Sequence, residues 1–366
     1  MAKKALFIWF KRYTELLEGG GLVNSRNYYM AQQILGDENV ESYYVHDEAH
    51  PSSLINKMFS AALFPFGYFN GLTPKKLRTI LRKAQGFDYV FISTSVFGII
   101  AKHLKKTGYK GIVIAHFHNV ESIFYQSYIS KRVPLRRIII ECAYRNDGYC
   151  MQYADRIVTL NSRDYNMLSY LHGIHKDGNI IPASIPDKFD SKKISKSIQT
   201  SSRPKCLFVG SRINANTEGV LWFVRNVLPH VDIDFMVVGK GMAKFKSVTS
   251  ELENIEVVGD APELDLYYYD ADFLVMPIFS GSGMKVKTCE ALMYGKNILC
   301  TDEALEGYDI DGDKFGGRCN TADEFISAIR HYSKHPIPRH NAYSRLYYES
   351  KLAPAVIQEK FRQVLQ

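Results

Sequence analysis

Two glycines, two lysines and a glutamate follow one another within a short stretch of this 366-residue chain: Gly281, Gly283, Lys285, Lys287 and Glu290. Glycines leave room for backbone N–H groups to approach an anion, and the start of a helix adds partial positive charge. The lysines add full charges, and a carboxylate further along can accept hydrogen bonds from hydroxyl groups. Together these residues predict a site for a diphosphate that carries a ribose.

The elements around this stretch would hold it in place. Residues 272–277, Asp-Phe-Leu-Val-Met-Pro, form an apolar run ended by proline, which predicts a buried parallel strand. Residues 280–283 would then be the loop, and a helix is expected from about 285 to 294. Two plainer interpretations stay open, namely an ordinary surface turn at the glycines and a solvated helix position at Glu290.

The complete pattern, Gly-x-Gly-x-Lys-x-Lys-x-x-Glu-Ala-x-x-x-Gly, is followed by an apolar segment at 297–301 and by Glu306-Gly307. It resembles the nucleotide-sugar site of retaining GT-B glycosyltransferases of family 4 and its relatives. The resemblance implies that Glu290 binds the ribose and that Lys285 and Lys287 neutralise the diphosphate. It also implies that a loop faces the donor sugar and phosphates, formed by Gly281, Ser282 and Gly283.

The first half of the chain resembles the same family. A strand is expected at 5–10, then a glycine loop at 19–21 and a helix-like pattern. The resemblance implies that Gly20 and Gly21 approach the donor diphosphate and the acceptor. A later strand ends in His-Asn-Val-Glu, and in the family the histidine of such a segment, here His118, lies near the transferred sugar.

The second half repeats the alternation of strands and helices, beginning with Cys206-Leu-Phe-Val-Gly-Ser-Arg212. Two such series predict an α/β protein with two doubly wound, Rossmann-like domains and a cleft between them, as in GT-B. We expect an acceptor-side domain at 1–190, a polar linker at 191–204 and a nucleotide-sugar domain at 205–342. A C-terminal helical segment at 343–366, interrupted near Pro354, would pack back on the first domain, by resemblance.

Composition agrees with two cores, because 46% of the residues are hydrophobic. No apolar run has transmembrane length, and the short apolar start favours a first strand over a signal peptide. We therefore expect a cytoplasmic protein, with peripheral placement at the inner face of the membrane left open. The six cysteines show no metal-type spacing and are expected to be reduced core residues.

The net charge of +8 leaves two interpretations open. Basic clusters at 102–110, 131–137 and 192–196 could contact anionic lipid or a lipid diphosphate acceptor, or could be solvated faces. An aromatic run at 58–72 would cap the first core or lie on a membrane, and we favour the core. Nucleic acid is not an expected partner, since aromatic and basic residues do not alternate as in known modules.

The sequence favours no metal site. Asp309-Ile-Asp-Gly-Asp313 departs from a calcium loop in the position of its glycine, and His116 and His118 lack further ligands. Members of the resembled family generally need no metal, and fixed cations stabilise the leaving diphosphate instead. The resemblance thus implies catalytic roles for His118, Arg212 and Lys287. We expect no cofactor, and we expect the substrate to be a UDP- or GDP-linked sugar.

The resemblance therefore predicts a retaining hexosyltransferase-like enzyme that acts on a glycan or lipid-linked acceptor, as in bacterial surface polysaccharide synthesis. Two departures from the family stand at Glu218, where a lysine is common, and at Ser282, where a carboxylate is common. Three alternatives are a nucleotide-sugar 2-epimerase of the same fold, a catalytically silent GT-B partner subunit, and a two-domain solute-binding protein, which the missing secretion signal disfavours.

Overall fold

A computed structural model describes residues 2–11, 20–46, 62–69, 71–194, 203–249, 252–335 and 337–366. The chain forms two compact units. Unit 1 comprises residues 1–182 and 357–366, and unit 2 comprises residues 183–356. The division falls after residue 182, whereas the polar composition led us to expect a linker at 191–204. Residues 191–193 instead form a short 3₁₀ helix, and residues 195–202 lie outside the described ranges.

Unit 1 contains a six-stranded parallel sheet in the order β2-β1-β3-β4-β5-β6. Its strands are β1 (Ala5–Lys11), β2 (Val40–His46), β3 (Tyr89–Ile92), β4 (Ile112–Phe117), β5 (Arg156–Thr159) and β6 (Gly178–Ile180). Its helices are α1 (Gly20–Leu35), α3 (Pro74–Ala84), α4 (Gly98–Lys106), α5 (Glu121–Tyr128), α6 (Arg136–Tyr153), α7 (Ser162–His172) and most of α15 (Pro354–Leu365).

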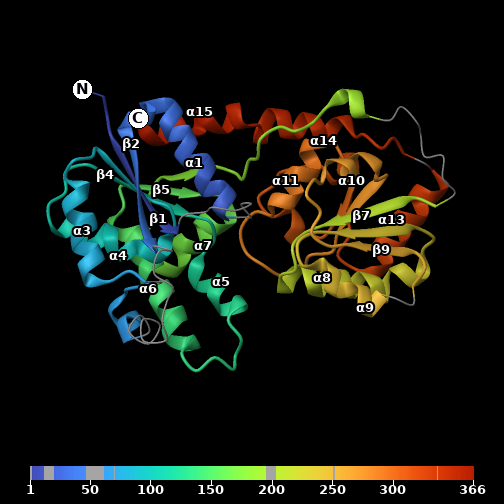
Figure 1. The fold of residues 1–366 in the computed structure, drawn as a ribbon, viewed down its shortest axis with the longest axis horizontal. Coiled ribbons are helices and arrows are strands. Elements are labelled where there is room, and N and C mark those ends of the chain that lie inside the picture. Colours follow the sequence, from blue (N-terminus) through green and yellow to red (C-terminus); the bar gives the residue numbers. More distant parts are fainter. Residues whose placement is uncertain are drawn as a thin grey trace. The chain divides into compact units, whose positions relative to one another are not determined.

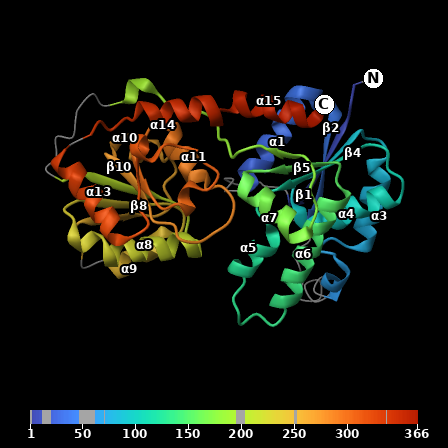
Figure 2. The same ribbon diagram turned by 180° about the vertical axis from the view of Figure 1, so that it is seen from behind.

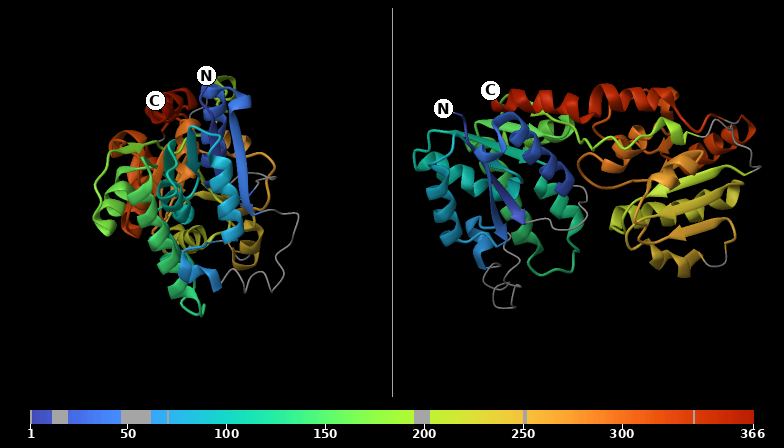
Figure 3. Two further views of the ribbon diagram at one scale, coloured as in Figure 1. Left: turned by 90° about the vertical axis from the view of Figure 1, so that its left-hand side faces the viewer. Right: turned by 45° about the horizontal axis from the view of Figure 1, so that its top comes forward.

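Alternation along β1 divides the core of unit 1 into two layers. Leu6 and Ile8 pack in a cluster with residues of α3, α4 and α6, whereas Phe7 and Trp9 pack with residues of α1 and α15. This is the period of two expected for a strand covered on both faces. Figure 1 shows these two sets of helices around the sheet, and Figure 3 shows α15 beside α1. The end of the chain thus belongs to the core of unit 1.

Unit 2 contains a second parallel sheet, in the order β12-β11-β10-β7-β8-β9. Its strands are β7 (Lys205–Val209), β8 (Asp234–Val238), β9 (Ile255–Val258), β10 (Phe273–Met276), β11 (Ile298–Cys300) and β12 (Gly316–Arg318). Its helices are α8 (Asn214–Asn226), α9 (Lys246–Thr249), α10 (Asp265–Asp270), α11 (Val286–Met293), α12 (Gly312–Phe315), α13 (Ala322–Lys334) and α14 (Ala342–Tyr347), followed by a π-helical turn, η8 (Tyr348–Leu352).

Two of the helices of unit 2 bring functional residues to the same edge of this sheet. Figure 2 shows α8 and α11 on opposite sides of the strands. Gly219 allows α8 to lie close to β10, because a Cβ at this position would be 2.0 Å from the carbonyl oxygen of Pro277. The two doubly wound sheets confirm the predicted fold class, and the buried strand at β10 and the helix at α11 confirm the elements expected around the lysines.

Several smaller expectations can be compared with the structure. All six cysteines are free and buried, as predicted. In the described part of the aromatic run, Phe69 and Leu72 lie in the core while Phe66 is 69% exposed, and residues 58–61 and 70 lie outside the described ranges. The helical tail is interrupted before Pro354, as expected. None of the described helices is long and apolar enough to span a bilayer.

Candidate nucleotide-sugar site

The charged residues predicted to bind the ligand in unit 2 lie at the carboxyl ends of β7 and β10. In doubly wound sheets this edge is where ligands bind, because the loops that follow neighbouring parallel strands meet there. The chain leaves β7 through Gly210 and enters α8 at Asn214, and it leaves β10 through a loop that ends at the start of α11. The sequence-predicted lysines and Glu290 are thereby placed at this edge.

Lys287 lies in the first turn of α11 and points toward the end of β7. Its ammonium group donates a hydrogen bond to the side-chain oxygen of Asn216 in α8 and lies 4.9 Å from the centre of the Phe208 ring. A Cβ at Gly210 would be 3.0 Å from the ammonium nitrogen, so glycine leaves the space that Lys287 occupies. Burial, with a smaller contribution from the charge of Lys285, lowers the pKa of Lys287 to about 7. An ammonium so poorly solvated would gain from an anionic ligand.

Lys285, two residues earlier, has a different environment. Its ammonium group forms an ion pair with Glu303 at 2.6 Å and donates to the carbonyl oxygen of Gly283 at 2.9 Å. Both charged side chains are mostly buried, with 11% and 20% exposure. The two lysines are therefore not equivalent: a carboxylate of unit 2 already balances the charge of Lys285.

The loop between β10 and α11 contains the two glycines that the sequence predicted there. Gly281 has a φ of 141° and Gly283 a φ of 65°, values that favour glycine. Ser282 lies half-buried between them, and Gly281 is exposed. The loop thus places an exposed glycine, Gly281, shortly before the start of α11, while Gly283 is buried. An exposed glycine near a helix start suits an anion.

Glu290 lies one helical turn after Lys287. Its Oε2 accepts a hydrogen bond from the hydroxyl of Tyr268 at 2.9 Å. Burial raises the pKa of Glu290, while the Tyr268 hydrogen bond and the charge of Lys188 favour its ionised form. The Tyr268 ring stacks on Tyr294 at 4.4 Å. Glu290 is therefore a fixed, partly desolvated acceptor on a rigid support.

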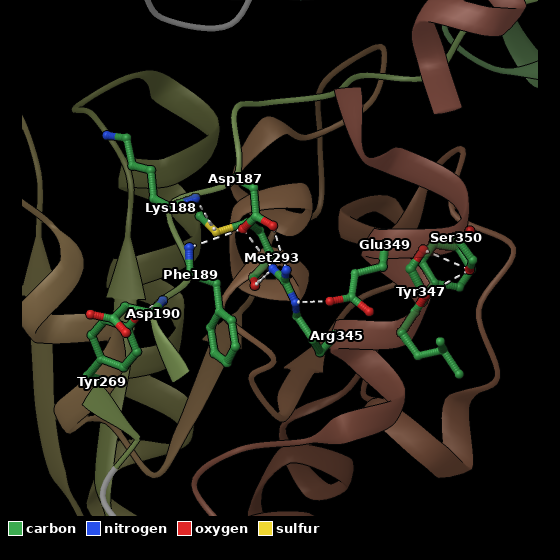
Figure 4. A network of polar contacts seen from close by, with 11 residues as sticks. Asp187, Lys188, Phe189, Asp190, Tyr269, Met293, Arg345, Tyr347, Glu349 and Ser350 are labelled. Atoms are coloured by element: carbon green, nitrogen blue, oxygen red, sulfur yellow. Dashed lines mark hydrogen bonds and ion pairs between the residues drawn. The ribbon is translucent and has the colours of Figure 1, made fainter. Parts of the chain in front are cut away.

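The C-terminal end of α11 is held by Arg345 of α14. The guanidinium donates to the carbonyl oxygen of Met293 at 2.7 Å and forms a two-pronged ion pair with Asp187 at 2.8 and 2.5 Å. It also pairs with Glu349 at 2.8 Å and lies over the Phe189 ring at 4.5 Å (Figure 4). The arginine thus connects α11, α14 and the segment that follows Ile185 within unit 2.

Arg212 and Glu218 lie at the same end of unit 2. The backbone N–H of Arg212 donates to the carbonyl oxygen of Lys240 at 2.9 Å, which fixes the turn after β7. Both side chains are exposed. Arg212 is therefore placed at the ligand-binding edge, and the acidic Glu218 lies in the second turn of α8.

In unit 1, His118 follows β4 at the carboxyl edge of the first sheet. Its Nε2 lies 2.8 Å from Oδ1 of Asn24 in α1. Burial, with the charge of Arg26 as a second cause, lowers the pKa of His118 to about 4. The imidazole is therefore neutral at physiological pH and donates to the asparagine oxygen through Nε2.

The glycines near the N-terminus differ from the expectation. Gly20 and Gly21 form the first turn of α1, and Gly19 lies outside the described ranges. The sequence predicts a glycine loop before the helix. A helix start still presents backbone N–H groups, because the first four have no partner within the helix.

Unit 1 also contains a buried carboxyl pair that the sequence did not reveal. Thr94 donates to Glu121 at 3.3 Å, and Ser95 donates to Asp147 at 2.7 Å. Burial and the nearby Asp147 raise the pKa of Glu121 to about 8, and burial raises the pKa of Asp147 to about 6. The available signal was the spacing of Asn146 and Asp147, which puts them on the same face of α6 as the buried residues Cys142, Ala143, Cys150 and Met151.

The structure thus brings Arg212, Lys285, Lys287 and Glu290 to one edge of unit 2, and it places His118 and Gly21 in unit 1. The sequence did not predict the residues that contact Lys287, Glu290 and Lys285. These are Asn216, Tyr268 and Glu303, and each lies outside the motif at 281–295. Among the described residues, no three His, Cys, Asp or Glu side chains gather in a way that could hold a metal ion.

The sequence of unit 2 matches a known protein family over most of its length. Residues 203–335 match the family model described as glycosyl transferases group 1. A search of curated proteins found no match.

Solved structures resemble the whole chain. They include HepE of Anabaena in complex with UDP (TM-score 0.68, 11% identity, 99% of each chain). Sucrose-phosphate synthase from Thermosynechococcus elongatus has a TM-score of 0.74 at 13% identity over 99% of this chain and 98% of that one. A glycosyltransferase from Rickettsia africae has a TM-score of 0.63 at 14% identity over the full length of both. At these identities the likeness establishes the GT-B fold.

Proposed function

We propose that this chain, whose residues 203–335 match the family model of glycosyl transferases group 1, is a retaining enzyme that transfers a sugar from a UDP- or GDP-linked donor. The acceptor we propose is a glycan or a lipid-linked glycan, in the synthesis of a bacterial surface polysaccharide in the cytoplasm. The family match and the GT-B fold support glycosyl transfer, and HepE of the same fold was solved with UDP and with UDP-glucose.

One observation carries the assignment of the donor site. Lys287 and Glu290 are three residues apart in α11, so they lie on neighbouring positions of one helix face. The poorly solvated ammonium of Lys287 suits a diphosphate, and the carboxylate held by Tyr268 suits a pair of ribose hydroxyls. A nucleoside diphosphate presents both groups.

The chemistry follows from these roles. As the bond between the sugar and the diphosphate breaks, negative charge develops on the leaving oxygen. The charges of Lys287 and Arg212 would stabilise it without a reorganisation of solvent. A leaving phosphate held in this way can accept the proton of the attacking acceptor hydroxyl on the same face of the sugar, which retains the configuration. We assign contact with the transferred sugar to His118, and we expect no requirement for a metal ion.

Nucleotide binding and turnover test the proposal in sequence. Thermal unfolding is followed with UDP, GDP, ADP and their sugars, since a ligand at a hundred times its Kd stabilises by about 2.7 kcal/mol. We expect one nucleoside diphosphate to raise the Tm more than its nucleoside does.

The preferred sugar donor is then incubated with the enzyme alone and with glycan acceptors, and products are identified by mass spectrometry. Failure of every nucleotide to shift the Tm would overturn the donor site. Binding without hydrolysis or transfer would instead identify a silent GT-B subunit. The anomeric configuration of the product, measured by NMR, tests retention separately.

A further inference from the structure

The segment that joins α5 to α6 has an unusual composition. From Ser122 to Ile140 the chain contains four basic residues and no acidic residue. We call residues 126–138 the basic loop; its cations are Lys131, Arg132, Arg136 and Arg137. Lys131, Arg132 and Arg137 are exposed, and none of the three forms an ion pair with a described residue. The loop therefore presents positive charge that nothing in the described structure balances.

The basic loop also exposes apolar side chains among these charges. Tyr128 is 61% exposed, and three aliphatic side chains are more than a third exposed: Val133 at 39%, Leu135 at 38% and Ile138 at 38%. Isolated exposed apolar residues are ordinary on a protein surface. Four within a short segment, alternating with cations, form a surface that fits an environment with both apolar and anionic parts.

The loop has a defined shape. The guanidinium of Arg136 donates to the carbonyl oxygens of Ile129, at 3.0 Å, and Gln126, at 2.5 Å, so this arginine closes the loop onto the end of α5. The Tyr128 ring stacks on Phe124 at 5.2 Å. The exposed residues are thus presented on a fixed support, with α6 leading away from them as Figure 1 shows.

We propose that the basic loop binds the surface of a membrane that contains anionic lipid. Cations would contact the head groups while the apolar side chains enter the boundary between head groups and acyl chains. A second copy of the chain fits poorly, because a two-fold interface would bring these positive charges against their own counterparts. This property does not depend on the transfer reaction and would bring the enzyme to lipid-linked acceptors.

Vesicle co-sedimentation tests the proposal with the full chain and no nucleotide. Binding is measured to phosphatidylcholine vesicles with and without phosphatidylglycerol, at low and high salt. We expect binding to the anionic vesicles alone, weakened by salt. The double variant Lys131→Ala/Arg132→Ala should bind roughly 30-fold more weakly, at about fivefold for each charge removed. Tyr128→Ser/Leu135→Ser should weaken binding too, because apolar insertion is lost.

The matched control is Lys75→Ala/Arg78→Ala, which removes two exposed positive charges from α3 of the same unit. It should bind as the wild type does, and all variants should unfold at similar temperatures. The proposal is overturned if the wild type does not bind anionic vesicles, or if the control weakens binding as much as the loop variant. Gel filtration showing a dimer that Lys131→Ala/Arg132→Ala dissociates would also overturn it.

Discussion

The hydroxyl of Tyr268 lies 2.9 Å from Oε2 of Glu290 and donates to it, across 22 positions of sequence. A hydrogen bond to a charged group contributes on the order of 1.5–3 kcal/mol. The contact fixes the carboxylate next to the turn of α11 that carries Lys287, and it offsets part of the cost of burying Glu290. Nucleotide recognition by unit 2 should therefore depend on both residues.

Glu290→Ala should weaken nucleoside diphosphate binding roughly tenfold to a hundredfold, because hydrogen bonds to a charged group are lost. It should also weaken binding of the nucleoside that lacks phosphates. Tyr268→Phe should have a smaller effect in the same direction, since the carboxylate remains. Calorimetric titration with both ligands measures these changes. Unchanged affinity of well-folded Glu290→Ala would show that the ribose binds elsewhere.

Lys287 should make diphosphate binding depend on pH. Its pKa in the free protein is lowered to about 7, so above that pH the side chain must take up a proton before it can pair with phosphate. Affinity should fall as pH rises above about 7, by up to about tenfold for each pH unit. Calorimetric titration with a nucleoside diphosphate at several pH values between 7.5 and 9.5 would measure this fall in affinity.

The matched control for this pH dependence is Lys287→Arg, because arginine keeps its charge throughout this range. The variant should bind with little dependence on pH. A slope of equal size in wild type and Lys287→Arg would assign the titration to another group.

Lys285 should matter less to the nucleotide than Lys287 does, since Glu303 already balances its charge at 2.6 Å. Lys285→Met should mainly lower the Tm, because it leaves a carboxylate mostly buried without its cation. The double variant Lys285→Met/Glu303→Leu should recover part of that loss. Equal losses of UDP affinity in Lys285→Met and Lys287→Met would show instead that both lysines bind phosphate.

His118→Ala should lower kcat by more than tenfold while nucleoside diphosphate binding stays within about twofold, because a contact made with the reacting sugar appears in turnover. Asn24→Ala should lower kcat less, as it removes only the partner that orients the ring. Steady-state kinetics and UDP titration separate the two effects. Wild-type turnover in His118→Ala would make the histidine structural.

The carboxyl pair should make the protein less stable as pH rises. The pKa of Glu121 is raised to about 8 in the folded state, so between about 4.5 and 8 the folded chain holds a proton that the unfolded chain releases. Stability is therefore lost across this window, and Asp147 contributes in its lower part. Glu121→Gln should flatten the dependence of Tm on pH above 6. An unchanged profile would show that Glu121 is ionised in the folded protein.

The spacing of residues along the chain was enough to predict the fold and part of the candidate site. The alternation of apolar runs with helical patterns predicted two doubly wound sheets. Buried strands appear as short apolar runs, whereas amphipathic helices repeat apolar residues with a period of about 3.6 residues. The relation between Lys287 and Glu290 was also readable, since residues three apart in a helix share a face. The glycine positions at 281 and 283 followed from the same motif, and the structure adds that both have a positive φ.

The sequence did not predict that α1 begins at Gly20 and Gly21. Consecutive glycines favour a loop by propensity, yet they open α1 in the structure. Propensity is a weak preference that tertiary packing overrides. The polar composition at 191–204 likewise could not indicate the division after residue 182, since composition reports exposure and does not report which sheet the preceding residues join.

Only the tertiary structure decided which charges are balanced. Lys285 meets Glu303 across 18 positions of sequence, and Lys287 meets Asn216 across 71. The two lysines look equivalent in the motif, but one is ion-paired while the other has a pKa lowered by burial. The physical reason is that a side chain's charge state and partners depend on the segments packed around it, and residue spacing along α11 does not specify those segments.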